Sequence, residues 1–461
     1  MTTRYDAIII GTGQSGPSLA GRLTREGRKV AIVERKRFGG TCVNNGCIPT
    51  KTLIASARAA QVARRAAEFG VMIEGPVRVD MKAVKARKDA IVRVSNEGVE
   101  QSLRENPGVT VYVGHARFVG PKEVEVGEQR LSAEQIFINV GGRADVPRIP
   151  GLERAPYYTN SSIMAVDFLP EHLVILGGSY IGLEFGQMYR RFGSEVTIIQ
   201  RNDRLIPRED EDVAQAIREI LEDEGIHILT DADATRVERR GEQVAVGVSV
   251  AGKAATVVGS HLLVATGRRP NTDDLGLEEA GVATDERGYI KVDGALQTNV
   301  PGIFAMGDGN GRGAFTHTSY NDFEIVAANL LDADPRRVED RIRTYGLFID
   351  PPLGRAGMTV DQVRRSGRKA LMGKRPMTRV GRAVEKGETQ GFMKVVVDAE
   401  TKEILGVAIL GVGGDEVVHS LLDIMSAKDP YTAIARTMHI HPTVSELVPT
   451  MLQEMTPLDR G

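Results

Sequence analysis

The two cysteines are the residues whose type and spacing most directly suggest chemistry. Cys42 and Cys47 are the only cysteines among 461 residues, and they share one short segment, so we interpret them as one device. Lys51 follows Cys47 by one helical turn, and a nearby cation stabilises a thiolate. Such a pair is suited to cycling between a dithiol and a disulfide. Zinc is the alternative, but it usually needs four nitrogen or sulfur ligands and the eight histidines are scattered, so we expect no metal.

A glycine-rich turn near the start of the chain predicts a dinucleotide site. The pattern runs strand, turn, helix and a strand closing on an acid, over residues 7–10, 11–16, 17–26 and 30–34. In such a unit Gly11, Gly13 and Gly16 permit a tight turn and a close approach of pyrophosphate, and Glu34 binds ribose hydroxyls. The N-terminus of the helix favours the phosphates. A βαβ crossover without a ligand is the alternative.

The same unit returns over residues 172–200, which predicts a second nucleotide. Gly177, Ser179 and Gly182 form its turn, and Gln200 stands at the spacing that Glu34 has in the first unit. Ser179 replaces the middle glycine, so its side chain is expected to crowd the pyrophosphate or bond to it.

The residues after the second unit favour NADPH over NADH. Gln200 carries no charge to repel a ribose 2′-phosphate, and three guanidinium groups could bind one, on Arg201, Arg204 and Arg208. The alternative is a solvated turn in which these arginines pair with the acids at 209–211.

Four segments together resemble one known family. The stretch GGTCVNNGCIPTK at 39–51 resembles the redox-active segment of the class I pyridine nucleotide-disulfide oxidoreductases, which include glutathione reductase, dihydrolipoamide dehydrogenase and mercuric reductase. ATGRRPN at 265–271, TNVPGIFAMGD at 298–308 and HPTVSE at 441–446 are similar to further segments of that family. The resemblance implies an α/β fold with two Rossmann-like domains, for FAD and NAD(P), and a C-terminal α+β dimerisation domain. We place the FAD domain at 1–148 and 269–334, the NAD(P) domain at 149–268 and the interface domain at 335–461.

The resemblance also implies roles for individual residues. Cys47 would lie against the flavin as a thiolate, and Cys42 would attack an outside disulfide. Lys51 would pair with Glu184 beside the flavin, and Tyr180 would be a gate that moves aside for nicotinamide. The FAD-binding residues would be Gly11, Gly13, Gly16, Glu34, Thr41, Lys51, Asp308 and His317, the last without a role in proton transfer. The NADP-binding residues would be Gly177, Ser179, Tyr180, Gly182, Glu184, Arg201, Arg208 and Gly267.

Near the C-terminus, His441 and Glu446 offer the acid and base that thiol exchange requires. In the family this histidine comes from the other subunit, so the resemblance implies a homodimer in which His441 completes the partner's site. His439 nearby is interpreted as structural.

We therefore predict an enzyme that passes hydride from NADPH through FAD to the Cys42–Cys47 disulfide and on to a small disulfide. The first alternative is reduction of metal ions, quinones or oxygen. No cysteine follows Cys47, whereas mercuric reductases of the usual type carry an additional C-terminal pair. Dihydrolipoamide dehydrogenase is the second alternative, for which an acid at position 200 would be expected. A structural subunit of a multienzyme complex is the third.

Composition limits the partners. With 59 basic and 61 acidic residues the net charge is -2, so no basic face and no nucleic-acid partner are expected. The apolar runs are too short to cross a membrane, and the N-terminus enters a strand pattern directly, so we expect a cytoplasmic protein. Two helices are predicted over 52–69 and 81–106, with their basic residues on a solvent-exposed face, and a C-terminal sheet over 344–410 is followed by a helix over 416–428.

Overall fold

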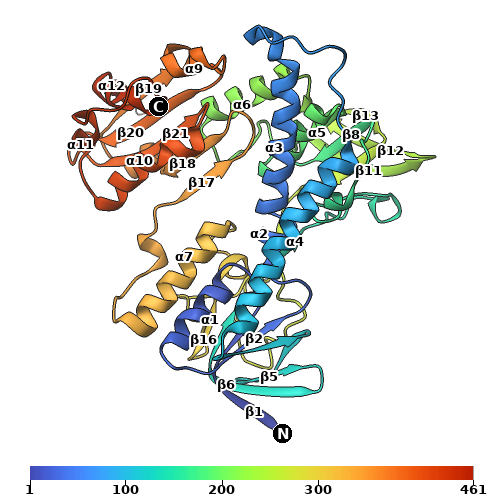
Figure 1. Ribbon diagram of the computed structural model, residues 1–461, viewed down its shortest axis with the longest axis vertical. Coiled ribbons are helices and arrows are strands. Elements are labelled where there is room, and N and C mark those ends of the chain that lie inside the picture. Colours follow the sequence, from blue (N-terminus) through green and yellow to red (C-terminus); the bar gives the residue numbers. More distant parts are fainter. Residues whose placement is uncertain (460–461) are drawn as a thin grey trace.

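A seven-stranded sheet carries the first nucleotide unit in the computed structural model, which describes residues 1–459. Its strand order is β3-β2-β1-β6-β5-β4, with β16 beside β6. The parallel strands are β1 (Thr2–Ile10), β2 (Val30–Glu34), β3 (Val109–Val113), β6 (Gln129–Ile138) and β16 (Ile303–Ala305), and the antiparallel ones are β4 (Ala116–Gly120) and β5 (Glu123–Val126). Helices α1 (Ser15–Arg25) and α7 (Thr316–Ala327) lie side by side against this sheet (Figure 1).

The second unit is a separate four-stranded parallel sheet of order β10-β9-β8-β14. Its elements are β8 (His172–Leu176), α5 (Tyr180–Phe192), β9 (Glu195–Ile199), α6 (Glu211–Asp223), β10 (His227–Leu229) and β14 (His261–Val264). An antiparallel sheet of β11 (Ala232–Arg240), β12 (Gln243–Val250) and β13 (Lys253–Gly259) adjoins it. Two Rossmann-type units are therefore present, as predicted.

Two short strands join the units. β7 (Gly142–Ala144) carries the chain toward the second unit, and β15 (Arg268–Pro270) pairs with it on the way back. The boundaries drawn after residues 148, 268 and 334 remain a prediction, and the last two residues of the 335–461 range lie outside the described part.

The C-terminal sheet has six strands, in the order β17-β18-β21-β20-β19-β22. They are β17 (Thr344–Leu347), β18 (Leu353–Gly357), β19 (Ala370–Pro376), β20 (Phe392–Asp398), β21 (Ile404–Leu410) and β22 (Thr456–Pro457). Every residue of β20 and β21 is buried, because α10 (Gly414–Ala427) packs against one face, and α8 (Val360–Ser366) and the second unit pack against the other. This α+β unit completes the predicted fold class.

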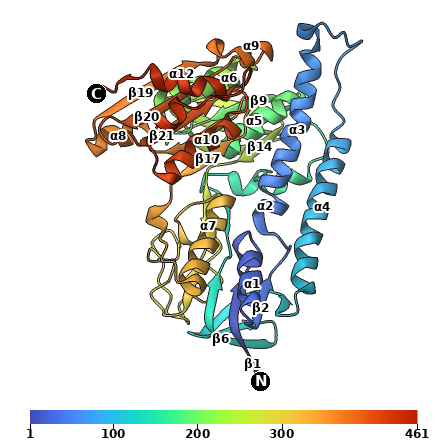
Figure 2. The ribbon, with the colours of Figure 1, turned by 60° about the vertical axis from the view of Figure 1, so that its left-hand side comes forward.

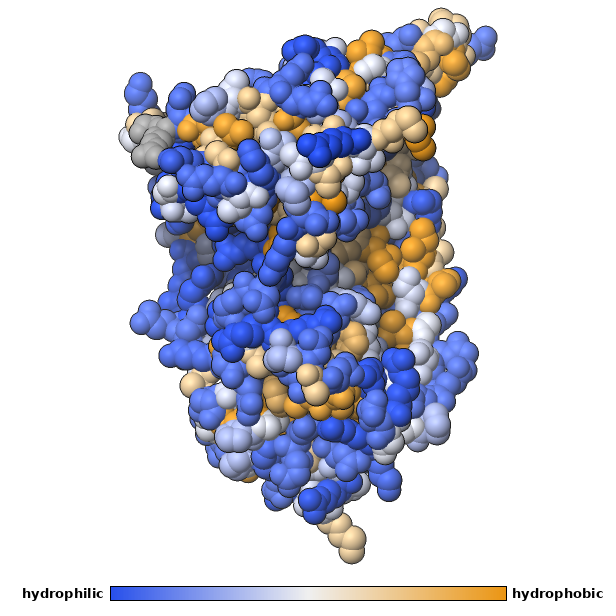
Figure 3. Space-filling view, turned by 90° about the vertical axis from the view of Figure 1, so that its left-hand side faces the viewer, coloured by the Kyte–Doolittle hydropathy of each residue, from blue (hydrophilic) through white to orange (hydrophobic). Residues whose placement is uncertain are grey.

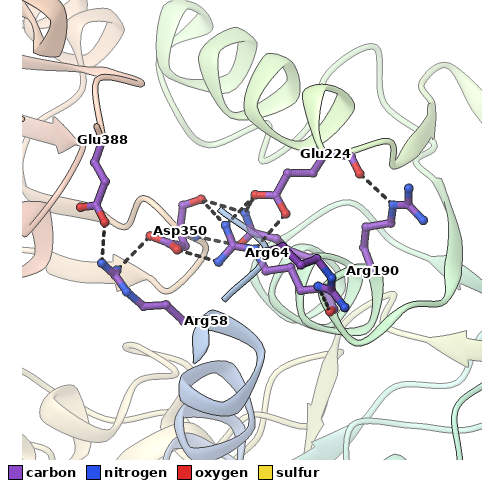
Figure 4. Close-up of polar contacts among 8 residues, drawn as sticks. Arg58, Arg64, Arg190, Glu224, Asp350 and Glu388 are labelled. Carbon is purple, nitrogen blue, oxygen red and sulfur yellow. Dashed lines mark hydrogen bonds and ion pairs between the residues drawn. The ribbon is translucent and has the colours of Figure 1, made fainter. Parts of the chain in front are cut away.

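Two long helices, α3 (Cys47–Arg64) and α4 (Met81–Glu105), run along one side of the molecule from the lower unit to the upper ones (Figure 2). The prediction that their basic residues form a solvent-exposed face is wrong in part. Lys88 is buried and its ammonium donates to the Met164 carbonyl oxygen at 2.7 Å. Arg58 pairs with Asp350 at 3.0 Å and with Glu388 at 2.7 Å (Figure 4). These side chains satisfy polar groups between units, which helical periodicity does not reveal.

The contacts in Figure 4 join three parts of the fold. On α5, Arg191 is buried and its guanidinium pairs with both Glu224 and Asp350 at 2.6 Å. Because Asp350 also binds Arg58, one carboxylate ties helix α3 to the second unit and to the C-terminal sheet. The positions of the three units are thus coupled by charge as well as by packing.

The face drawn in Figure 3 is mostly hydrophilic and is hollowed at mid-height, between the upper and lower parts. Among the helices of residues 1–459, none combines the length and the apolar character that a membrane span requires.

Candidate active site

One cavity of about 900 Å³ lies where the three units meet. Of the predicted site residues, it is lined by Gly11, Gly13, Glu34, Thr41, Cys42, Cys47, Lys51, Tyr180, Glu184, Asp308 and His317. The remaining ones, Gly16, Gly177, Ser179, Gly182, Arg201, Arg208, Gly267, His441 and Glu446, are not among its lining residues. The fold therefore gathers the cysteines, the first glycine turn and the Lys–Glu pair at one place.

The cysteines lie on two successive helices. Cys42 is on α2 (Gly40–Asn44) and is half-buried, whereas Cys47 begins α3 and is exposed; both are free thiols. The backbone reverses before them at Gly39, whose φ of 87° favours glycine. The short turn between α2 and α3 brings the two thiols together over the cavity.

The surroundings of the two thiols shift their pKa values in opposite directions. A hydrogen bond from Cys42, the hydroxyl of Thr316 and the ammonium of Lys51 together outweigh burial and lower the pKa of Cys47 to about 6. The same hydrogen bond, together with burial, raises the pKa of Cys42. The distance from Thr316 Oγ1 to Cys47 Sγ is 3.0 Å. In the reduced pair, Cys47 is therefore the thiolate and Cys42 the protonated thiol.

The predicted contact between Lys51 and Glu184 is present. Lys51 Nζ lies 2.8 Å from Glu184 Oε2, and the Glu184 side chain is only 8% exposed. Phe348 contacts both members of this pair. Its backbone N–H donates to Glu184 Oε1 at 3.1 Å, and its ring centroid lies 4.3 Å from Lys51 Nζ. A buried carboxyl group thus accepts from two donors, and it fixes the ammonium beside Cys47.

The first glycine turn fits a dinucleotide. A Cβ atom on Gly11 would collide with the Asn139 carbonyl oxygen, and one on Gly16 would collide with the Gly11 carbonyl oxygen. A Cβ on Gly13 would make only ordinary contacts with the protein, so the missing side chain there clears room on the cavity side. Glu34 accepts hydrogen bonds from the Thr12 hydroxyl at 2.5 Å and from the Lys36 N–H at 2.9 Å. This turn therefore leaves the space that a dinucleotide requires, with the Glu34 carboxyl group at the edge of the same cavity.

Asp308 and the start of α7 also line the cavity. Asp308 Oδ2 lies 3.3 Å from Arg268 Nη2. Helix α7 begins at Thr316, and its free N–H groups give that end a partial positive charge. His317 donates to the Thr344 carbonyl oxygen at 2.7 Å, and burial lowers the pKa of its imidazole. His317 is thus neutral and tied to the backbone.

The second glycine turn repeats the geometry of the first. A Cβ on Gly177 would collide with the Ala265 carbonyl oxygen, and one on Gly182 would collide with the Gly177 carbonyl oxygen. Ser179 caps α5 with its backbone and makes no side-chain capping bond. Gln200 is buried and its amide oxygen accepts from the Gly178 N–H at 2.9 Å, so it braces this turn.

The turn that carries Arg201 and Arg208, called the arginine turn below, exposes these two cations to solvent. Arg201 and Arg208 are exposed, and neither lies within 4.0 Å of a carboxylate of residues 1–459. The neighbouring acids face inward instead, since Glu209 and Asp210 are buried against Arg355 at 3.7 and 3.3 Å. The alternative in which these two acids neutralise the arginines does not agree with this geometry.

Three aromatic rings form one wall of the cavity. The Tyr180 ring meets Phe315 edge-on at a centroid distance of 5.8 Å and Tyr345 at 5.6 Å. Phe315 and Tyr345 stack at 5.7 Å. Only Tyr180 was expected, because the other two come from distant segments and carry no sequence motif.

The C-terminal pair is formed but lies apart from the cysteines. His441 Nδ1 is 2.7 Å from Glu446 Oε2, with the His441 side chain 83% exposed and that of Glu446 11% exposed. This arrangement orients an imidazole outward, away from the cavity of its own chain.

Comparisons with known proteins agree with this site. Residues 5–322 match the family model described as pyridine nucleotide-disulphide oxidoreductase, and residues 344–452 match the dimerisation domain of that family. The chain is 36% identical over 451 residues to the probable pyridine nucleotide-disulfide oxidoreductase RclA of Escherichia coli, covering 96% of this chain and 97% of that protein. It is 33% identical to the dihydrolipoyl dehydrogenase of Thermus scotoductus, covering 96% and 95% of the two chains, and 33% identical to the mercuric reductase of Streptomyces lividans, covering 98% and 97%.

Solved structures extend the likeness to three dimensions. The HOCl-induced flavoprotein disulfide reductase RclA from Escherichia coli matches with a TM-score of 0.89 and 35% identity, over 98% of this chain and 100% of that one. A Cu(II) complex of the same protein matches with a TM-score of 0.89 over 97% and 99%. The predicted family is thereby confirmed: the chain belongs to the pyridine nucleotide-disulfide oxidoreductases and is a flavin-dependent enzyme of that family.

Proposed function

We propose that the protein is an NADPH-dependent reductase of a small disulfide, with Cys42 and Cys47 as its redox pair. The observation that carries this proposal is the acidity difference within the pair, in the same cavity as the first glycine turn. FAD, when bound, supplies the two-electron transfer between nicotinamide and the disulfide. The chain's own residues must then handle thiols and protons.

In the exchange step, Cys42 Sγ attacks one sulfur of the acceptor disulfide, forming a mixed disulfide and releasing one thiolate. Cys47 Sγ then attacks Cys42 Sγ, which closes the Cys42–Cys47 disulfide and releases the second thiolate. The acceptor gains two electrons and the cysteine pair loses two. Because the pKa of Cys42 is raised, the first attack needs a base, and the released thiolate needs an acid.

We assign that base and acid to His441 of the partner subunit in a homodimer. The exposure of His441, its contact with Glu446 and its place within the residues that match the dimerisation domain support this assignment. Glu446 would orient the imidazole through its contact with Nδ1.

NADPH is the proposed donor because of the arginine turn. Gln200 is turned inward and Glu209 and Asp210 are engaged with Arg355, so the guanidinium groups of Arg201 and Arg208 keep their charge available for a 2′-phosphate. An acid that would bind the ribose of NADH, as a dihydrolipoamide dehydrogenase would use, is lacking at position 200.

We also propose a cytoplasmic location. A redox pair that must return to the dithiol after each cycle suits a reducing compartment.

Copper(II) is a second candidate acceptor, because a structural relative forms a Cu(II) complex and Cys47 is exposed here. Thiolate ligands favour Cu(I), which is the product of one-electron reduction of Cu(II). Within residues 1–459, no three or more His, Cys, Asp or Glu side chains are grouped so that they could hold a metal ion.

Replacement of Cys42 by serine separates the two candidates. Reduction of a small disulfide such as cystine, followed by NADPH consumption, should fall by at least about a thousandfold, since the attacking sulfur is lost. Cu(II) reduction that persists in the same variant would identify copper as an acceptor that does not need exchange. Disulfide reduction that survives in the variant would refute the proposal.

A further inference from the structure

The wall of the cavity is tied to the arginine turn by one tyrosine. Tyr345 lies on β17 and its ring contacts both Tyr180 and Phe315. Its hydroxyl donates a hydrogen bond to the carboxylate of Glu209, a residue that follows Arg208 directly. The Tyr345 side chain of the C-terminal sheet is therefore hydrogen-bonded to the Glu209 carboxylate of the second nucleotide unit.

The acid that holds Tyr345 is itself fixed. Glu209 has a fully buried side chain, and its backbone N–H donates to the Ile206 carbonyl oxygen at 2.9 Å. The Ile206 N–H in turn donates to the Gly178 carbonyl oxygen at 3.0 Å, within the glycine turn. A short chain of contacts thus leads from the second glycine turn to Glu209.

Cations of the C-terminal sheet hold the same acids from the other side. Arg355 is 3% exposed and reaches Glu209 at 3.7 Å, while Lys394, 2% exposed, pairs with the neighbouring Asp210 at 2.8 Å. A shift of the buried Glu209 carboxyl group would move it away from Arg355, the cation beside it. Tyr345 is consequently bonded to a buried acceptor that has a cation at its side.

We propose that Tyr345 is a positioning residue of the nicotinamide gate: its bond to Glu209 fixes its ring against Tyr180 and holds that gate closed while nicotinamide is absent. This inference rests on the proposed function and on the role of Tyr180 as the gate, which the family resemblance implies. The three rings meet edge-on and face-on, so rotation of Tyr180 requires Tyr345 or Phe315 to yield. Without its hydrogen bond to Glu209, the Tyr345 ring would move aside for Tyr180 more readily.

The test is binding of unreactive tetrahydro-NADPH to the flavin-loaded dimer, measured by calorimetry. The apparent affinity equals the affinity of the open form multiplied by the fraction of molecules whose gate is open. Tyr345→Phe raises that fraction, so it should bind this ligand roughly three- to tenfold more tightly than the native enzyme. Binding of an adenosine bisphosphate that lacks the nicotinamide ring should not change. Tyr112→Phe is the matched control, because it removes a tyrosine hydroxyl that bonds only the Tyr5 hydroxyl, at 2.7 Å, and both affinities should stay native.

Tyr180→Ala provides the reference for an absent gate. It should bind tetrahydro-NADPH at least as tightly as Tyr345→Phe, and adding Tyr345→Phe in that background should produce no further gain. Glu209→Gln, which weakens the same bond, should shift affinity in the same direction and serves if Tyr345→Phe does not fold. Unchanged affinity in Tyr345→Phe, or equal changes for both ligands, would overturn the inference. Unchanged affinity in Tyr180→Ala would show that Tyr180 is no gate and would also overturn the inference, whereas the proposed function stands or falls separately with Cys42→Ser.

Discussion

Replacing Thr316 by valine tests how the protein makes Cys47 a thiolate. Valine keeps the β-branched shape of threonine and removes only the hydroxyl that lies 3.0 Å from Cys47 Sγ. In the structure the hydrogen bond from Cys42 lowers the pKa of Cys47 most strongly, with Thr316 and Lys51 adding to it. The substitution therefore removes one of three stabilising groups.

The size of the effect follows from the charge on sulfur. A hydrogen bond to a charged group is worth about 1.5–3 kcal/mol, and one pKa unit corresponds to about 1.4 kcal/mol. Because Cys42 and Lys51 remain, we expect the lower end of this range, so the pKa of Cys47 should rise by about one unit from its native value of about 6. The thiolate would then be lost at a higher pH as the solution is acidified.

The assay is a pH titration of the two-electron-reduced enzyme, following the long-wavelength absorbance that a thiolate beside oxidised flavin produces. The midpoint in Thr316→Val should lie about one unit above the native midpoint. Thr316→Ser keeps the hydroxyl and should titrate like the native enzyme. An identical midpoint in Thr316→Val would refute the reasoning, because the hydroxyl would then contribute nothing to the thiolate.

Three further predictions test other parts of the account. Arg201→Glu should lower kcat/KM for NADPH about tenfold or more and spare NADH, in steady-state kinetics, because it places an anion beside the 2′-phosphate; equal use of both donors by the native enzyme would contradict the NADPH assignment. Arg191→Met should cost about 3 kcal/mol and lower the melting temperature in calorimetry, since it leaves two acids between units without their cation; a native melting temperature would contradict the coupling of the units. A refolded mixture of His441→Ala and Cys42→Ser chains should regain about a quarter of the native activity, because half of the dimers then contain one complete site; no recovery would argue against a histidine supplied by the partner.

Much of the fold is predictable because it rests on local pattern. The buried run at Ala7–Ile10 and its repeat at Leu173–Leu176, each followed by glycines and a helix, indicate two Rossmann units, and both are present. The first strand extends back to Thr2, because pairing with β6 begins there. Residues 2–6 are polar and mostly exposed, so no hydrophobic pattern marks that extension.

The site was predictable where residues share a motif and not where the fold brings distant segments together. The pairing of Lys51 with Glu184 could be expected from the resemblance, whereas Thr316, Phe348 and Tyr345 could not. Each of these three reaches the cavity from an element more than 130 positions away from the residue it contacts. Only the packing of α7 and β17 against the nucleotide units brings them there.

Anaerobic titration of the purified enzyme with NADPH tests the central claim most directly. The account predicts a long-wavelength absorbance band after two electrons, because the Cys47 thiolate is stabilised beside the cavity that receives the flavin. Bleaching of the flavin without such a band would contradict the account, since Cys42 and Cys47 would then lie outside the path of the electrons.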